Sequence, residues 1–128
     1  MENEFIRKNL AEKINTILNV TIPQEIPSYD EIGNNCARLY YEGSTYDAAK
    51  MQTRYNFRFC YYTEVRSHAA EKASALEEYL KTAVPEPFYY NGSNFCIRYY
   101  NIISDTLSRA NASGIFYFCA EVTFSAVL

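Results

Sequence analysis

The feature of this sequence that most constrains its fold is a twelve-residue segment, Thr53 to Glu64, in which aromatic and polar side chains alternate. Every second position carries threonine, tyrosine or phenylalanine, and the positions between them are largely polar, including Arg54 and Arg58. Only a β-strand gives a period of two over such a length, because successive side chains point to opposite faces of a sheet. The alternation therefore predicts a strand whose aromatic face packs on another layer while its other face meets water or a partner.

Further segments have the composition of strands. Ile115 to Val127 alternates in the same way, and Cys36 to Tyr41 is a short, largely apolar run. Phe88 to Tyr90 and Phe95 to Ile103 flank Asn91-Gly92, a dipeptide that supplies the positive φ angles of a two-residue hairpin turn. We therefore expect five strands, two of which form a hairpin.

Two segments repeat apolar residues at the spacing of an amphipathic helix. In the first, Glu2 to Leu18, the apolar stripe is Ile6, Leu10, Ile14 and Ile17. In the second, which begins with Ser67 as the expected N-cap, the stripe is Ala69, Ala73, Leu76, Leu80 and Ala83. Because alanine is small, this helix can lie close to a neighbouring layer, and we expect it to cover the aromatic face of the first strand described.

Proline, glycine and polar residues predict the connecting segments. An extended connector is expected over Thr21 to Asn34, and a loop over Glu42 to Asp47. Ser104 to Ser113 is also expected to be a loop, with a helical turn over Thr106 to Ala110 as the alternative.

These elements predict a single α+β domain over residues 1–128, with a mainly antiparallel sheet, helices on one face and the order α-β-β-α-β-β-β. A chain of this length can bury a sufficient core without metal or disulfide. Its 12 basic and 15 acidic residues give a net charge of −3, without the basic stripe of a protein that depends on phosphate contacts. The apolar runs are too short for a membrane helix, so we expect no membrane partner.

The residues that commonly carry catalysis or bind metals form no recognisable motif. The four cysteines include no CxxC pair and lie in apolar segments, which favours buried free thiols over disulfides or a zinc knuckle: Cys36, Cys60, Cys96 and Cys119. His68 is the only histidine, and Glu77 and Glu78 point about 100° apart on one helix. We therefore expect neither an enzyme activity nor a cofactor.

Tyrosine, arginine and cysteine gather on the sheet face away from the helices. The alternation places these residues there: Arg38, Tyr40, Arg54, Arg58, Cys60, Tyr62, Arg98, Tyr100, Tyr117, Cys119 and Glu121. Tyrosine and arginine are enriched in protein interfaces. The candidate oligomer interface is therefore Arg54, Arg58, Tyr62, Arg98, Tyr100 and Tyr117. A half-exposed sheet without a partner and a stacking surface for single-stranded nucleic acid are the alternatives.

In the order of its expected helices and strands and in the residue types of each, the chain resembles the tail terminator and tail completion proteins, small minor capsid proteins of long-tailed bacteriophages. Four segments carry the resemblance: the helix from Ile6 to Leu18 with its proline-containing connector, the strand Tyr55-Asn56-Phe57-Arg58-Phe59, the alanine-rich helix from Ala69 to Leu80, and the aromatic strand from Ile115 to Phe124. Together they span nearly the whole chain as architecture.

The resemblance implies a structural virion protein at the head–tail junction, assembled in the cytoplasm of the host bacterium. It implies a homo-oligomeric, hexameric ring that caps the tail tube, contacts the tail tube protein and the head connector proteins, and lets DNA pass without specific binding. In that family the loop between the first two strands reaches toward the tube. The corresponding candidate contacts here are Glu42, Thr45, Tyr46, Asp47 and Lys50. Substituting Arg58 or Tyr62 by glutamate is then expected to break the ring and leave the fold intact.

A small-ligand-binding or enzymatic α+β domain is the alternative class. Its pocket would lie between the helices and the sheet and would be lined by Tyr55, Phe59, Tyr99 and Phe118. Such a pocket needs polar groups aimed at a ligand, and the helix-facing positions offer few besides tyrosine hydroxyls.

Overall fold

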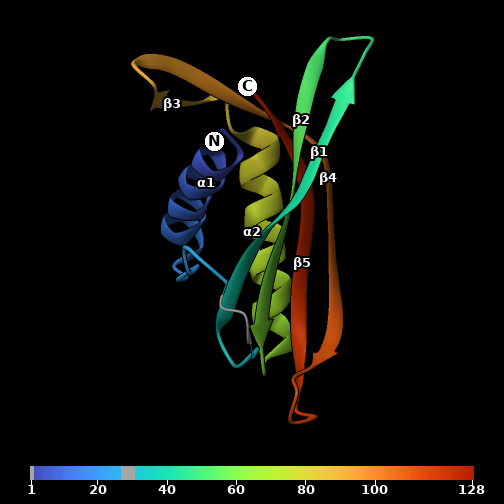
Figure 1. Cartoon of the computed structure of the whole chain (residues 1–128). Helices are drawn as coiled ribbons and strands as arrows, with labels where there is room; N and C mark the ends of the chain where they lie inside the picture. Colours follow the sequence, from blue (N-terminus) through green and yellow to red (C-terminus); the bar gives the residue numbers. More distant parts are fainter. Residues whose placement is uncertain (1, 27–30) are drawn as a thin grey trace.

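The computed structural model describes residues 2–26 and 31–128 of the chain (Figure 1). Two helices and five strands follow in the predicted order: α1 (Glu2–Leu18), β1 (Cys36–Asp47), β2 (Gln52–Thr63), α2 (Arg66–Thr82), β3 (Glu86–Tyr90), β4 (Ser93–Ala110) and β5 (Phe116–Val127). The prediction of an α+β fold is confirmed. None of the described helices is long and apolar enough to cross a membrane.

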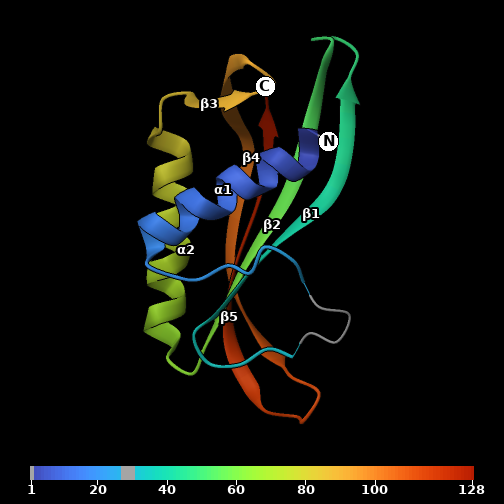
Figure 2. The ribbon, with the colours of Figure 1, turned by 60° about the vertical axis from the view of Figure 1, so that its left-hand side comes forward.

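The strands form one antiparallel sheet in the order β1-β2-β5-β4-β3. Both helices lie on the same face of this sheet: α2 runs along the long strands, and α1 crosses over them (Figure 2). The β1–β2 hairpin extends beyond the helices at one end of the molecule, and the β4–β5 turn extends at the other (Figure 1). The opposite face of the sheet carries no described helix.

The main core fills the space between the helices and the sheet. Phe57 and Phe59 of β2 are fully buried there, and Phe57 stacks on Phe124 of β5 with ring centroids 5.8 Å apart. The helices bury the following residues against them: Ile6, Leu10, Ala11, Ile14, Leu18, Ala69, Ala73, Leu76 and Leu80. Ile17, predicted in the buried stripe, is 38% exposed, because the row of residues spaced four apart from Ile6 continues to Leu18.

Two segments predicted as loops are strands. Glu42 to Asp47 continues β1 after a bulge between Tyr41 and Ser44, so that the connection to β2 shrinks to residues 48–51. Ser104 to Ala110 continues β4 and pairs with β5 throughout. Both predictions were wrong for the same reason. The side chains of these segments are mostly exposed or half-buried, so the sequence carries no alternation of apolar and polar residues there. Backbone pairing with a neighbouring strand makes them strands all the same.

The prediction of Ser67 as the N-cap of α2 is also wrong. Val65 occupies the N-cap position in extended conformation, and no side chain caps the helix. The backbone N–H groups of His68 and Ala69 donate to the Val65 carbonyl at 3.0 and 3.3 Å. The helix therefore starts directly from the end of β2, and Ser67 lies in its first turn. At the other end, Ala83 is the C-cap.

The hairpin predicted from Asn91-Gly92 is confirmed. The two residues have φ angles of 51° and 77°, and they join Tyr90 to Ser93, the closing pair of β3 and β4. Two successive positive φ angles match the twist of the flanking strands.

The described part of the predicted connector, residues 21–26 and 31–34, contains neither helix nor strand; residues 27–30 lie outside the described residues. Arg7 of α1 holds its first part in place. The Arg7 guanidinium donates to the carbonyls of Pro23 at 3.2 Å and Gln24 at 2.6 Å, and also to Leu39 of β1 at 3.0 Å. One side chain thus joins the helix, the connector and the sheet.

Candidate functional site

The strand register brings distant residues together on the sheet face away from the helices. Cys60 of β2 lies opposite Glu121 of β5, and Tyr62 lies opposite Cys119. On the other side of β2, Tyr62 faces Cys36 of β1. The sequence alternation predicts one face for Cys60, Tyr62, Cys119 and Glu121, and the register makes them neighbours and adds Cys36 beside them.

Part of this face is a second, smaller core, which we call the thiol cluster. It consists of Cys60, Tyr62, Tyr117 and Cys119, with Ile32, Cys36 and Tyr40 packed against it. Tyr62 and Tyr117, both in the candidate oligomer interface, are only 6% and 8% exposed. They therefore offer little surface to a second molecule.

Two connecting segments close one end of the thiol cluster. Asn111 of the β4–β5 turn donates from Nδ2 to the Ile32 carbonyl at 3.4 Å, and Ser113 donates from its hydroxyl to Glu31 at 3.2 Å. The Asn34 side chain accepts from the Glu64 backbone N–H at 2.9 Å. These contacts, made by residues far apart in sequence, cover a face that the alternation alone predicts as half-exposed.

Arg58 lies at the edge of the thiol cluster. Its guanidinium donates from Nη1 to Cys60 Sγ at 3.4 Å, forms an ion pair with Glu42, and lies 4.4 Å from the ring centroid of Tyr40. The hydrogen bond from Cys119, followed by the positive charge of Arg58, lowers the pKa of the Cys60 thiol in spite of its burial. The same hydrogen bond and burial raise the pKa of Cys119.

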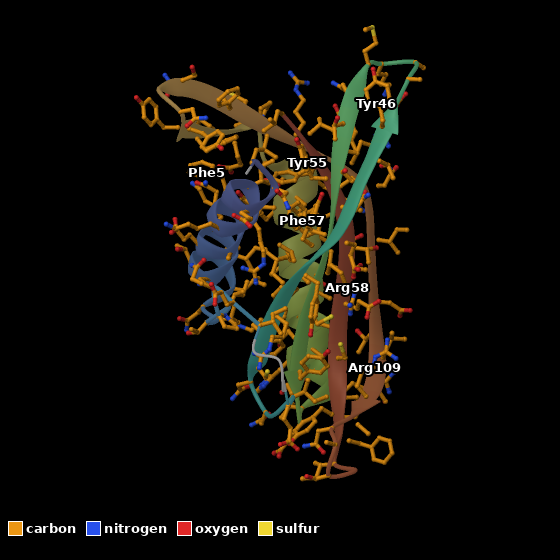
Figure 3. The ribbon with its side chains drawn as sticks, in the orientation of Figure 1. Phe5, Tyr46, Tyr55, Phe57, Arg58 and Arg109 are labelled. Carbon is orange, nitrogen blue, oxygen red and sulfur yellow. The ribbon has the colours of Figure 1, made fainter. Side chains whose placement is uncertain are left out.

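Glu121 forms the other side of this group. Its carboxylate lies 3.4 Å from Nη2 of Arg109 on β4. The Sγ atoms of Cys60 and Cys119 and one carboxylate oxygen of Glu121 lie within 4.8 Å of one another. Figure 3 shows Arg58 and Arg109 on the same face of the sheet, at different heights along it.

The remaining members of the candidate interface lie further along the same face. Arg54 pairs with Asp47 at 3.3 Å, and its guanidinium lies 5.5 Å from the ring centroid of Tyr100. Nζ of Lys50 lies 5.7 Å from the centroid of the same ring. Arg98 is exposed on β4, two residues before Tyr100. The six predicted residues therefore form two groups, one around the thiol cluster and one around Tyr100.

The residues predicted to contact the tail tube lie on the β1–β2 hairpin. Asp47 organises its tip, because Oδ1 accepts from the backbone N–H groups of Ala49 at 3.1 Å and Lys50 at 3.2 Å. Tyr46 projects from this tip (Figure 3), and Thr45 is exposed beside it. Glu42 lies lower on β1 and is bound to Arg58. Only Lys50 of the five belongs to the connecting turn.

The four residues of the alternative aromatic pocket belong to the core. Phe59 is fully buried, and Tyr55, Tyr99 and Phe118 pack against the main core. The larger hollows in the described part of the chain are surface grooves, including one of about 400 Å³ bordered by α1, Tyr79 and Glu86. His68 is exposed, and Glu77 binds Ser104 and Lys81.

Buried tyrosines make the fold sensitive to high pH. Burial raises the pKa of Tyr62, Tyr79 and Tyr99, and for Tyr79 a hydrogen bond to Glu86 adds to this effect. An unfolded tyrosine loses its proton near pH 10. The unfolded chain therefore binds fewer protons than the folded one above that pH, and stability falls as the pH rises.

We expect the contribution of these tyrosines to stability to be fully present below pH ~10 and to be lost above it, so that the chain unfolds at alkaline pH. An absorbance titration of tyrosinate, run with circular dichroism, should show a group of tyrosines that ionise only as the fold is lost. Ionisation of all 13 tyrosines before any loss of structure would contradict this expectation.

Sequence reasoning missed two features of this face: the meeting of Cys60, Cys119 and Glu121, and the exposed edge of β4. The first was hidden because strand order was unknown, and the second because Ser104 to Ala110 lacks a strand pattern. Comparison of the sequence with protein-family models and with curated proteins finds no match.

Proposed function

We propose that this protein is a structural subunit that assembles head to tail into a closed ring, of the tail terminator type that its sequence resembles. The observation that carries the proposal is the pair of open sheet edges. Within the described residues, β1 forms one edge, and β3 covers only Ser93 to Ile97 of β4, which leaves the rest of β4 as an edge on the other side.

The direction of the two edges suits a head-to-tail contact. β1, β2, β5 and β4 pair successively in antiparallel fashion, so β1 and β4 run in opposite directions. A second copy placed beside the first in the same orientation would therefore continue an antiparallel sheet. Repeated contacts of this kind close into a ring when the rotation between copies permits it.

The two edges are not equally available for pairing. In the first half of β1, the Ala37 carbonyl accepts from Arg38 at 2.9 Å and the Leu39 carbonyl accepts from Arg7 at 3.0 Å. The open edge of β4 instead carries Ile103, a large apolar side chain that is 65% exposed. We therefore place the joint between this part of β4 and the second half of β1, from Glu42 to Asp47.

The β1–β2 hairpin is the part of the subunit best suited to reach a neighbouring ring. It projects beyond the helices (Figure 1), and it presents Tyr46 and Met51 as exposed large side chains. Exposed apolar side chains on a projecting element fit a contact with a tail tube protein. The net charge of −3 would let DNA pass through the ring without strong binding.

Native mass tests the ring directly. Light scattering after size exclusion, over a wide concentration range, is expected to show a closed oligomer, near 89 kDa for six copies of the 14.8 kDa chain. A monomer at every concentration, including in the presence of assembled tail tubes, would contradict the proposal.

A substitution at the β4 edge tests the joint. Ile103→Glu is expected to abolish the oligomer and to leave circular dichroism and the melting temperature unchanged, because the side chain is exposed. Val84→Glu is the matched control, since Val84 is also exposed but lies in the α2–β3 connection. Equal assembly of both variants would place the joint elsewhere. Tyr62→Glu, the test that the sequence suggested, would instead put a charge into the thiol cluster.

A further inference from the structure

Two thiols of the thiol cluster and the neighbouring carboxylate of Glu121 form a group of possible metal ligands that ring assembly does not use. Sγ of Cys60, Sγ of Cys119 and a carboxylate oxygen of Glu121 lie within 4.8 Å of one another. A tetrahedral zinc ion with bonds of about 2.3 Å holds its sulfur ligands about 3.8 Å apart. Small side-chain rotations would therefore bring the three ligand atoms to the spacing that zinc requires.

We propose that Cys60, Cys119 and Glu121 form a binding site for one thiophilic divalent metal ion, best suited to Zn²⁺. The two thiols are fully buried, whereas Glu121 is partly exposed. The ion can therefore enter beside Glu121, where solvent can supply its fourth ligand. This inference does not depend on ring assembly, because the three ligands belong to one chain.

The backbone holds the three ligands rigidly. Cys60 and Glu121 are directly opposite each other on β2 and β5, the two innermost of the long strands. Cys119 lies two residues before Glu121, so its side chain is on the same face of the sheet. Ligands on paired strands need little ordering when the ion binds, which favours affinity.

The neighbouring charges compensate for the bound form. Two thiolates and one carboxylate exceed the charge of a divalent ion by one negative charge. Two positive charges lie beside these ligands: Arg58 donates to Cys60 Sγ, and Arg109 pairs with Glu121. The carboxylate of Glu42, which pairs with Arg58, adds one negative charge, so the surroundings contribute one net positive charge. Binding thus exchanges two thiol protons for one divalent ion without leaving a net charge in the cluster.

Cobalt serves as the probe in the experiment. The full chain, reduced and stripped of metal with a chelator, is titrated with Co²⁺. We expect one ion per chain, with thiolate-to-cobalt absorption in the near ultraviolet and the visible bands of a tetrahedral site. Zn²⁺ should displace the Co²⁺, which removes these bands, and should raise the melting temperature because it binds the folded chain. Failure of the fully reduced chain to bind Co²⁺ or Zn²⁺ would overturn the proposal, even if Cys60 and Cys119 can be oxidised to a disulfide.

Variants separate this site from adventitious thiol binding. Cys60→Ser and Cys119→Ser should lose the thiolate bands, and Glu121→Gln, at a partly exposed position, should weaken binding at least ~10-fold without unfolding the chain. Cys96→Ser is the matched control, because Cys96 is an exposed thiol on β4 outside the cluster. Loss of the bands in Cys96→Ser, or unchanged binding in Glu121→Gln, would refute the assignment.

Discussion

Replacing Phe57 by alanine is expected to lower the free energy of unfolding by about 3–5 kcal/mol. Phe57 is buried at the centre of β2, with Phe124 at 5.8 Å on one side and Tyr41 at 5.6 Å on the other. Alanine would leave a cavity in the main core between the sheet and the helices, and the cost of that cavity adds to the lost burial of the ring. Since domains of this size are stable by only about 5–15 kcal/mol, the variant should be close to unfolding at 37 °C.

Equilibrium denaturation with urea measures this loss. Phe116→Ala is the matched control: it removes the same side chain from β5, where the ring is 74% exposed, and should change stability by less than about 0.5 kcal/mol. Similar losses in the two variants would mean that β2 does not form the centre of the core.

Replacing Arg7 by methionine is expected to cost about 2–3 kcal/mol, because three backbone carbonyls lose a charged donor. Methionine keeps the apolar stem of the side chain, so the loss reports mainly on the hydrogen bonds to Pro23, Gln24 and Leu39. The loss of stability in Arg7→Lys should be smaller than in Arg7→Met but still measurable, because an ammonium group keeps the charge and cannot reproduce the forked donors of the guanidinium.

Lys8→Met provides the comparison for Arg7, since Lys8 is exposed on the same helix. Urea denaturation should show little change in Lys8→Met. Relative to the unsubstituted protein, the Arg7 variants should show faster hydrogen exchange in α1 and in residues 21–26, and little change in β2 and β5. Uniform acceleration across the sheet would contradict a local role for Arg7.

The elements that the sequence predicts well are those with long periodic burial. The alternation from Thr53 to Glu64 matches β2 to within a residue at each end, and the helical stripe through Ile6, Leu10 and Ile14 matches α1. The Asn91-Gly92 turn is local backbone chemistry, and it too could be predicted. Fold class followed from these elements, because their faces must be buried against each other.

The candidate site was predictable only in part. The alternation placed Cys60, Cys119 and Glu121 on one face, but their contact depends on β5 pairing with β2, which no turn signal encodes. Tyr62 and Tyr117 share this face and were expected to be available to a partner. The connection before β1 and the β4–β5 turn close the end of the cluster that contains them, and such coverage has no local signature.

By itself, therefore, the sequence determined the helices, the central strands, one hairpin and the face on which the residues of the predicted strands lie, because these depend on residues close together along the chain. The tertiary structure alone decided the strand order, the extension of β1 and β4 into polar segments, and the closure of the thiol cluster. Those features depend on pairing between residues that are far apart in sequence. In such pairing the backbone N–H and C=O groups of one strand bind those of the next, whatever the pattern of side chains.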